Sequence, residues 1–123
     1  MNILIDTHIY LWLLSMPDKI SSKRLDLLEH YSNNVYFSSV SIAELMIKSS
    51  IDKIKIDFDP ILHAKKAGFE LIDFTPSEAL LLKNLPFFHK DPFDRMLICQ
   101  SIYNNYYLMS DDIKFRDYDC KFI

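Results

Sequence analysis

The 123-residue sequence predicts an α/β fold in which a parallel sheet is covered by helices on both faces. Short runs of apolar and β-branched residues alternate with longer stretches of helical pattern, which is the order that strand–helix–strand units produce. The first run, residues 2–5, is dominated by isoleucine and leucine, as is typical of a parallel strand buried on both faces. The chain has the length of one domain, so we expect residues 1–123 to form a single domain.

The expected strands are short β-forming runs that end at polar or turn-forming residues. The run at residues 35–39 begins with Val-Tyr-Phe and follows an Asn-Asn turn. Helices separate the runs, so the strands are expected to be parallel with right-handed crossovers. Along the chain they occupy residues 2–5, 35–39, 69–74 and 106–109, with a candidate edge strand at residues 121–123.

The expected helices begin at residues that cap helices well. Asp59 and Asp91 each precede a proline, the residue favoured at the first helical position. Ser41 and Glu44 have the spacing of a capping box, and Gly68 marks a helix end. The expected helices cover residues 8–15, 22–32, 41–50, 59–67, 75–85 and 91–104, and a short one begins at residues 110–112.

Four acidic residues fall at the carboxyl edge of this expected sheet. Asp6 directly follows the first strand, Glu44 lies one helical turn past the second, and Asp112 follows the fourth. Asp94 lies in the first turn of the helix that leads into the fourth strand, and it reaches the same edge if the preceding helix crosses back over the sheet. Ligands of open α/β sheets bind beyond the carboxyl ends of the strands, so the four acids define a candidate site.

The chemistry expected of such a site is metal-assisted. Clustered carboxylates repel one another, and a cation keeps them ionised. Oxygen ligands without a histidine pair or a cysteine pair favour Mg²⁺ or Mn²⁺ over zinc. Such an ion activates a bound water and holds a phosphate for in-line attack, which predicts phosphodiester hydrolysis. Taken singly, each acid is also explained as a helix cap or as a favourable charge near a helix start, so their convergence carries the prediction.

Composition excludes several other kinds of site. A net charge of −3 argues against a protein that coats nucleic acid non-specifically, which needs a basic face. Gly68 is the only glycine, so the chain has no glycine-rich phosphate loop and no dinucleotide-binding fingerprint. Cys99 and Cys120 have no metal or redox spacing, and no signal peptide or spanning segment is visible, which predicts a cytoplasmic protein.

Four blocks of the sequence resemble the signature blocks of PIN-domain ribonucleases, and especially those of VapC-type toxins of bacterial toxin–antitoxin pairs. The blocks are ILIDTHIYLWLL, SSVSIAEL, HKDPFDRMLICQS and LMSDDIKF, and they occur in the order of that family. The resemblance implies a three-layer α/β/α sandwich with a five-stranded parallel sheet of order 3-2-1-4-5. It also implies a Mg²⁺- or Mn²⁺-dependent endoribonuclease that forms a homodimer and is held inactive by a small cognate antitoxin.

The resemblance also assigns roles to individual residues. Thr7 and Ser110 are expected to orient the carboxylates or metal-bound waters, and Ser110 stands where the family usually has threonine. The family's four acids, which bind the metal and carry catalysis, correspond to Asp6, Glu44, Asp94 and Asp112.

Two further aspartates compete for places in the acidic site. Asp91 is expected to cap the helix that begins at Pro92, which aims Asp94 at the edge of the sheet. Asp111 is a second candidate for the fourth acidic position. We prefer Asp112 because its spacing to Phe115 matches the family pattern.

Other polar residues keep two interpretations. Arg95 either meets an RNA phosphate or the acidic cluster, or is a surface cation of its helix. His89 is either an ordinary loop residue or touches substrate. Lys48, Lys53 and Lys55 either steer RNA or belong to a solvated face. His8 is expected to pack or to join an interface, since residues 9–13 make its helix apolar all round, as for a helix in contact with a second copy or an antitoxin.

Three other functions stay open. A receiver-like phospho-acceptor signalling module has a similar length, sheet and acidic Mg²⁺ site, with Asp73 as the acceptor, but the two helices between the first two strands argue against it. The second alternative is a PIN fold that has lost catalysis and acts as a binding module, and the presence of all four acids argues against it. The third is a PIN-fold RNA-processing nuclease that is not a toxin.

Overall fold

The computed structural model describes residues 1–123 and has a five-stranded parallel sheet of order β3-β2-β1-β4-β5. β1 lies at the centre and pairs in parallel with β2 on one side and β4 on the other. This order confirms the fold class and the strand order expected from the sequence. The strands are β1 (Asn2–Ile5), β2 (Asn34–Ser38), β3 (Glu70–Ile72), β4 (Tyr107–Met109) and β5 (Lys121–Phe122).

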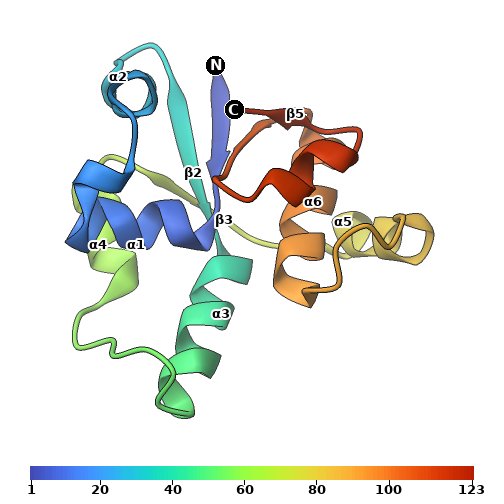
Figure 1. Cartoon of the computed structure of the whole chain (residues 1–123), viewed down its shortest axis with the longest axis horizontal. Helices are drawn as coiled ribbons and strands as arrows, with labels where there is room; N and C mark the ends of the chain where they lie inside the picture. Colours follow the sequence, from blue (N-terminus) through green and yellow to red (C-terminus); the bar gives the residue numbers. More distant parts are fainter.

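Six α-helices and three short 3-10 helices connect the strands (Figure 1). The α-helices are α1 (Thr7–Ser15), α2 (Ser22–Glu29), α3 (Ser39–Ser50), α4 (Pro60–Lys66), α5 (Pro76–Leu80) and α6 (Pro92–Asn104). The 3-10 helices are η1 (Pro17–Lys19), η2 (Leu81–Asn84) and η3 (Ile113–Asp117). None of these helices has the length and hydrophobicity that a membrane span requires.

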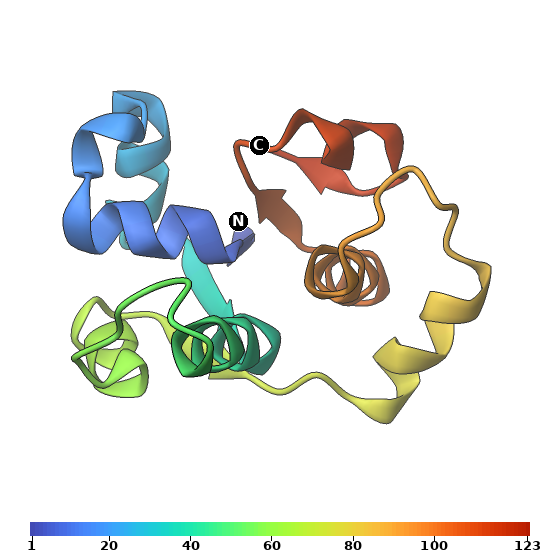
Figure 2. The same ribbon diagram turned by 60° about the horizontal axis from the view of Figure 1, so that its bottom comes forward.

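Alternate residues of β1 point into two separate hydrophobic cores. Ile3 and Ile5 pack in one core with side chains of α1, α2 and α4, whereas Leu4 packs in the other with side chains of α6 and η3. Figures 1 and 2 show α1, α2 and α4 on one side of the sheet and α5 and α6 on the other. The molecule is therefore the expected three-layer sandwich, with both faces of the sheet covered.

Most of the expected helix caps are present. The side chains of Asp59 and Asp91 accept hydrogen bonds from backbone N–H groups in the first turns of α4 and α6, each before a proline. Gly68 follows α4 with a φ of 82°, the left-handed conformation expected of a glycine at a helix end. Local signals thus placed these helix boundaries within a few residues.

The capping box expected at Ser41 and Glu44 is wrong. Helix α3 begins at Ser39, and its cap is Ser38, whose hydroxyl accepts the Val40 N–H at 3.1 Å. Helix α3 therefore starts two residues earlier than its sequence suggests, and Glu44 lies in its second turn. Its carboxylate is not used at the helix end and is available for contacts across the sheet edge.

The sheet order excludes the receiver-like module. Receiver folds have a strand order of 2-1-3-4-5, with the third strand inside the sheet. Here β3 is an edge strand, and Asp73 after it is exposed. The Asp73 carbonyl accepts a hydrogen bond from the Gln100 amide at 3.0 Å. An acceptor site at Asp73 is therefore not part of this structure.

Candidate active site

Three of the four expected acids line one pocket at the carboxyl edge of the sheet. Asp6 follows β1, Asp112 follows β4, and Asp94 lies in the first turn of α6. The pocket has a volume of about 230 Å³, and its other lining residues are His8, Trp12 and Asp111. Glu44 does not line it but lies close enough that its charge raises the pKa of both Asp6 and Asp94.

Asp6 is held by hydrogen bonds to both carboxylate oxygens. Its Oδ1 accepts the Ile9 N–H at 2.8 Å, which caps α1, and its Oδ2 accepts the hydroxyl of Ser110. Burial raises the pKa of Asp6 above its usual value, although these two hydrogen bonds oppose the rise. Asp6 is therefore both a helix cap and a site carboxylate, and Ser110 contacts it as expected.

Glu44 is buried between two donors from different helices. The hydroxyl of Thr7, at the start of α1, lies 2.6 Å from Oε1, and the ammonium of Lys48 lies 2.6 Å from Oε2. The bond to Glu44 raises the pKa of Lys48, so this lysine stays charged. Lys48 is thus a cation inside the acidic cluster, and it does not belong to a fully solvated face.

Asp94 is the carboxylate with the most perturbed environment in the pocket. Burial, followed by the charges of Asp91, Glu44, Asp6 and Asp112, raises its pKa to about 8. At neutral pH the Asp94 carboxyl therefore keeps a proton unless a cation replaces it. Asp91 accepts the Asp94 N–H at 3.0 Å, so it caps α6 as expected and fixes the position of Asp94.

Asp112 and Asp111 point to different partners. Burial alone would raise the pKa of Asp112, but hydrogen bonds from the Lys114 N–H, at 2.9 Å, and from the His89 ring lower it below its usual value. Asp111 is mostly exposed and forms an ion pair with Arg24 at 3.0 Å. Of the two neighbours, only Asp112 meets the other site residues through hydrogen bonds.

His89 belongs to the acidic cluster, although the sequence left open whether it was an ordinary loop residue. It is buried, and its Nε2 lies 2.9 Å from Asp112 Oδ2 and 3.0 Å from Asp94 Oδ2. One ligand atom from each of His89, Asp94 and Asp112 lies within 4.8 Å of the others. The only signal in the sequence was that His89 opens the block containing Asp94.

Arg95 is not a surface cation of its helix, because its side chain is buried, and it does not reach the acids. A contact with an RNA phosphate, the other possibility, does not fit this buried position. The side chain is buried, with its guanidinium 3.9 Å from the centre of the Phe87 ring. Its nitrogens donate to backbone carbonyls of the segment before α6, those of Leu82, Leu85, Pro86 and His89. Arg95 therefore fixes the loop that carries His89.

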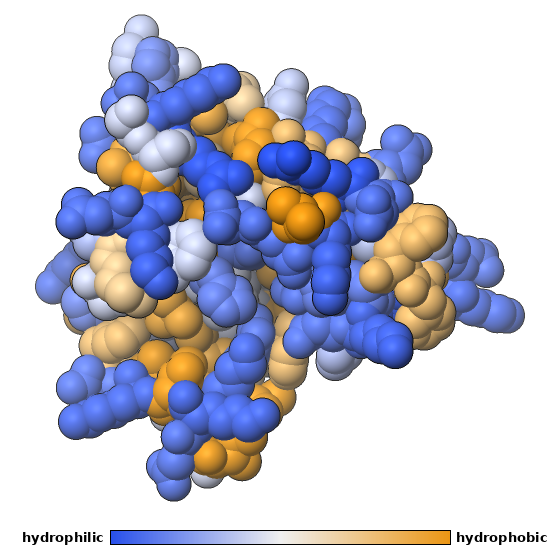
Figure 3. Space-filling view, viewed as in Figure 1, coloured by the Kyte–Doolittle hydropathy of each residue, from blue (hydrophilic) through white to orange (hydrophobic).

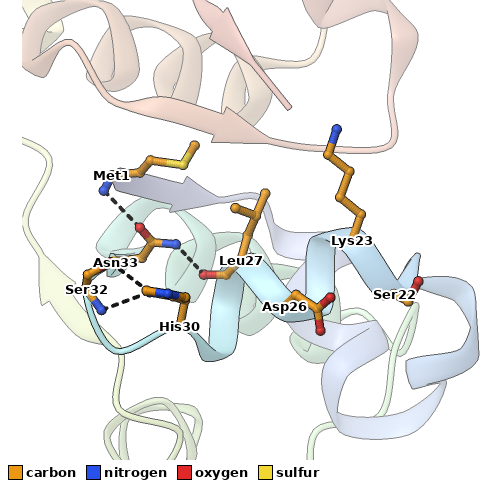
Figure 4. Close-up of a pocket in the computed structure, with 8 residues that line it drawn as sticks. All are labelled: Met1, Ser22, Lys23, Asp26, Leu27, His30, Ser32 and Asn33. Atoms are coloured by element: carbon orange, nitrogen blue, oxygen red, sulfur yellow. Dashed lines mark hydrogen bonds between the residues drawn. The ribbon is translucent and has the colours of Figure 1, made fainter.

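A second hollow on the surface lies away from these acids. It is an open depression of about 490 Å³ beside α2, lined by side chains such as Lys23, Asp26 and His30 (Figure 4). Its polar groups mostly bond to one another, as with Met1 and Asn33. The chemistry of the acids, rather than the size of a cavity, identifies the candidate site.

A match to a family model shows which protein family this chain belongs to. The family model of the PIN domain matches residues 3–121, nearly the whole chain. The chain belongs to the PIN-domain family. Members of this family are nucleases. No curated protein matches the sequence significantly.

Solved structures with the same fold cover this PIN domain almost completely. VapBC2 from Rickettsia felis, bound to a promoter DNA fragment, has a TM-score of 0.76 and 20% identity over 100% of this chain and 98% of its own. FitAcB from Neisseria gonorrhoeae has a TM-score of 0.64 and 19% identity, with 98% and 96% covered. VapBC-1 from nontypeable Haemophilus influenzae has a TM-score of 0.65 and 16% identity, with 100% and 97% covered. At these identities the likeness concerns the fold.

The donors in the pocket of this PIN domain fit a hard divalent cation. Carboxylate oxygens from separate segments face one another, and Asp94 keeps a proton because burial and the neighbouring acidic charges raise its pKa. Only one imidazole, that of His89, belongs to the group that could hold an ion with Asp94 and Asp112, and no cysteine lines the pocket, which disfavours a zinc site of the usual kind. Carboxylate oxygens are ligands that suit Mg²⁺ and Mn²⁺.

The raised pKa of Asp94 predicts a pH-dependent stability of the metal-free protein. The unfolded chain loses this proton near pH 4, whereas the folded protein keeps it until about pH 8, so stability falls as pH rises between them. Asp94→Asn removes this loss. We expect its stability advantage over the wild type to grow by roughly 1–3 kcal/mol from pH 5 to pH 8, as measured by urea unfolding in EDTA. Asp111→Asn is the control, and an equal advantage at both pH values would contradict the prediction.

The position of Arg95 predicts a loss of stability when it is replaced by lysine. One ammonium group does not reach four separate carbonyls, so Arg95→Lys should lower the unfolding free energy by about 1–3 kcal/mol. Arg116→Lys, at an exposed position, should change it by less than about 0.5 kcal/mol. If Arg95→Lys kept wild-type stability but bound RNA more weakly, the structural role assigned to Arg95 would be wrong.

Proposed function

We propose that this PIN domain is a metal-dependent endoribonuclease that hydrolyses RNA phosphodiester bonds. The observation that carries the proposal is the convergence of Asp6, Asp94 and Asp112 on one pocket at the carboxyl edge of the sheet, in a member of a nuclease family. Together with Glu44 beside them, these carboxylates supply the oxygen ligands that Mg²⁺ or Mn²⁺ requires.

The site residues divide into cation ligands and groups that orient them. When bound, the ion supplies a Lewis acid that offsets phosphate charge and lowers the pKa of the attacking water. Asp94 must release its proton to act as a ligand, since its pKa is about 8 in the absence of the ion. Ser110 holds Asp6 and Thr7 holds Glu44, so both carboxylates keep one orientation.

We further propose that the nuclease is the toxin of a toxin–antitoxin pair. The similar structures include VapBC and FitAB complexes, and the sequence blocks resemble those of VapC-type toxins, which a small antitoxin holds inactive. A groove of about 440 Å³ between α1, α2 and α4 is lined mostly by apolar side chains, including Leu13, Leu14 and Leu25, and it suits the apolar face of a small antitoxin.

We also propose a homodimer. Met46, Ile47 and Ile51, on α3 and at its end, are large hydrophobic residues that are at least 41% exposed. Figure 3 shows hydrophobic side chains at the surface over α3 and the segment after it. A second copy that covers this face would remove them from water.

An RNA-processing nuclease that is not a toxin is the second candidate function. Both candidates share the acidic site, so cleavage alone does not separate them. A gene for a short antitoxin beside this gene, together with growth arrest when this protein is made alone, would favour the toxin. Cleavage without growth arrest would favour RNA processing.

The proposal predicts that single carboxylates are indispensable. Asp6→Asn and Asp94→Asn should each slow Mg²⁺-dependent RNA cleavage by at least about 100-fold, equivalent to about 2.7 kcal/mol, and should relieve growth arrest. Each change removes a charged ligand and keeps the side-chain shape. Purified proteins are assayed on a fluorescent single-stranded RNA and, in parallel, on DNA of the same sequence. A folded double variant that cleaves RNA at the wild-type rate would rule out this site, and cleavage in excess EDTA would exclude metal dependence.

Two neighbouring aspartates should respond differently to the same substitution. Asp91→Ser keeps a side chain that caps helices, so cleavage should stay within a few-fold of wild type. Asp94→Ser removes a ligand and should slow cleavage by at least about 100-fold, or about 2.7 kcal/mol. Equal losses in the two variants would make Asp91 a further member of the acidic site.

A further inference from the structure

His89 contacts both of the segments that carry Asp94 and Asp112, through its backbone and its ring. Its backbone N–H donates to the Tyr118 hydroxyl at 2.8 Å, and its carbonyl accepts from Arg95 at 3.3 Å. Its ring lies 5.6 Å from the ring of Phe115, centre to centre. A buried loop residue with this many fixed contacts has a defined ring position.

The hydrogen bonds of the ring also define its tautomer. Nδ1 accepts the Asp91 N–H at 3.2 Å, so this nitrogen carries no hydrogen. Nε2 of the neutral ring therefore carries the hydrogen, and it faces Asp112 Oδ2 at 2.9 Å and Asp94 Oδ2 at 3.0 Å. The ring thus presents one N–H to one carboxyl oxygen from each of Asp94 and Asp112.

We infer that His89 is a positioning residue, whose Nε2–H holds the carboxylates of Asp94 and Asp112 together at one metal-binding point. The inference rests on the proposed metal-dependent function and adds a residue to it. Asp94 belongs to α6 and Asp112 to the loop after β4, so no shared element sets the distance between them. The imidazole bridges this gap from a third segment, the loop before α6.

A direct bond from His89 to the metal fits this geometry less well. Nε2 would need to lose its hydrogen, and the neutral ring would then carry it on Nδ1. That hydrogen would point at the Asp91 N–H, which now donates to the same nitrogen, so two donors would face each other. The capped start of α6 thus favours the tautomer that donates to the carboxylates.

Asparagine and glutamine at position 89 separate the two hydrogen bonds of the ring. Asparagine places its amide near the position of Nδ1 and does not reach the carboxylates. Glutamine places its amide N–H₂ near the position of Nε2 and gives up the bond to Asp91. His89→Asn should weaken Mn²⁺ binding by roughly 10–100-fold, the usual effect of losing a group that orients metal ligands. His89→Gln should keep affinity close to that of the wild type.

The test measures Mn²⁺ binding to the full chain by the electron paramagnetic resonance signal of free Mn²⁺, with RNA cleavage measured in parallel. His30→Asn, at an exposed histidine outside the site, is the control, and it should bind as the wild type does. Thermal unfolding of each variant checks the fold. Pulsed resonance spectra of the wild-type complex should show no coupling from a coordinated imidazole nitrogen.

The outcomes distinguish the inference from the proposed function. If Asp94→Asn abolishes Mn²⁺ binding but a folded His89→Asn binds as tightly as the wild type, the role of His89 is wrong and the metal site stands. An imidazole coupling that disappears in His89→Gln would make His89 a ligand and overturn the positioning role. A wild-type protein that binds no Mn²⁺ would overturn the metal-dependent function and the role of His89 with it.

Discussion

The mutual repulsion of carboxylates at one edge of the sheet is the constraint on which the rest of this site depends. The parallel sheet brings the ends of β1, β2 and β4 to the same edge, so the acids that follow them are forced together by topology. Burial is the largest cause of the raised pKa of Asp6 and Asp94, and the repulsion adds to it. A carboxyl in this position either keeps a proton or shares a cation with its neighbours. Because a bound cation would offset the repulsion, the site is suited to bind a metal.

The donors around the acids come from segments distant in the chain. Thr7 and Lys48 hold Glu44, Ser110 holds Asp6, and His89 lies between the remaining two carboxylates. Each of these contacts joins two elements, except the pair of Lys48 and Glu44 within α3. The acidic site is therefore also a set of hydrogen bonds that ties the helical layers to the edge of the sheet.

The loop before α6 shows how polar groups outside the acidic cluster hold one of its residues in place. The buried guanidinium of Arg95 satisfies carbonyls of this loop, and the Tyr118 hydroxyl bridges the His89 N–H and the Pro86 carbonyl. Backbone groups buried in an irregular segment need such partners. With them, the loop places the His89 imidazole at a defined position without regular secondary structure.

Signals that lie within a few residues of one another determined much of this protein. The runs of apolar residues predicted the strands, and Asp-Pro pairs predicted the starts of α4 and α6. The position of each acid just after a strand or helix start predicted that the four would meet at one edge. These features follow from the sequence alone because backbone conformation responds to neighbouring side chains and hydrophobic periodicity.

Only the tertiary structure decided where individual polar side chains point. The spacing of Ser41 and Glu44 matched a capping box, yet Glu44 bonds to Thr7, which lies 37 residues away in the chain. His89 meets Asp112 across 23 residues, and Arg95 turns toward the loop behind it instead of toward the acids. Such contacts depend on how helices pack against the sheet, and no local pattern records that packing. The sequence alone thus determined which acids share an edge, and the packed fold decided which donors orient them.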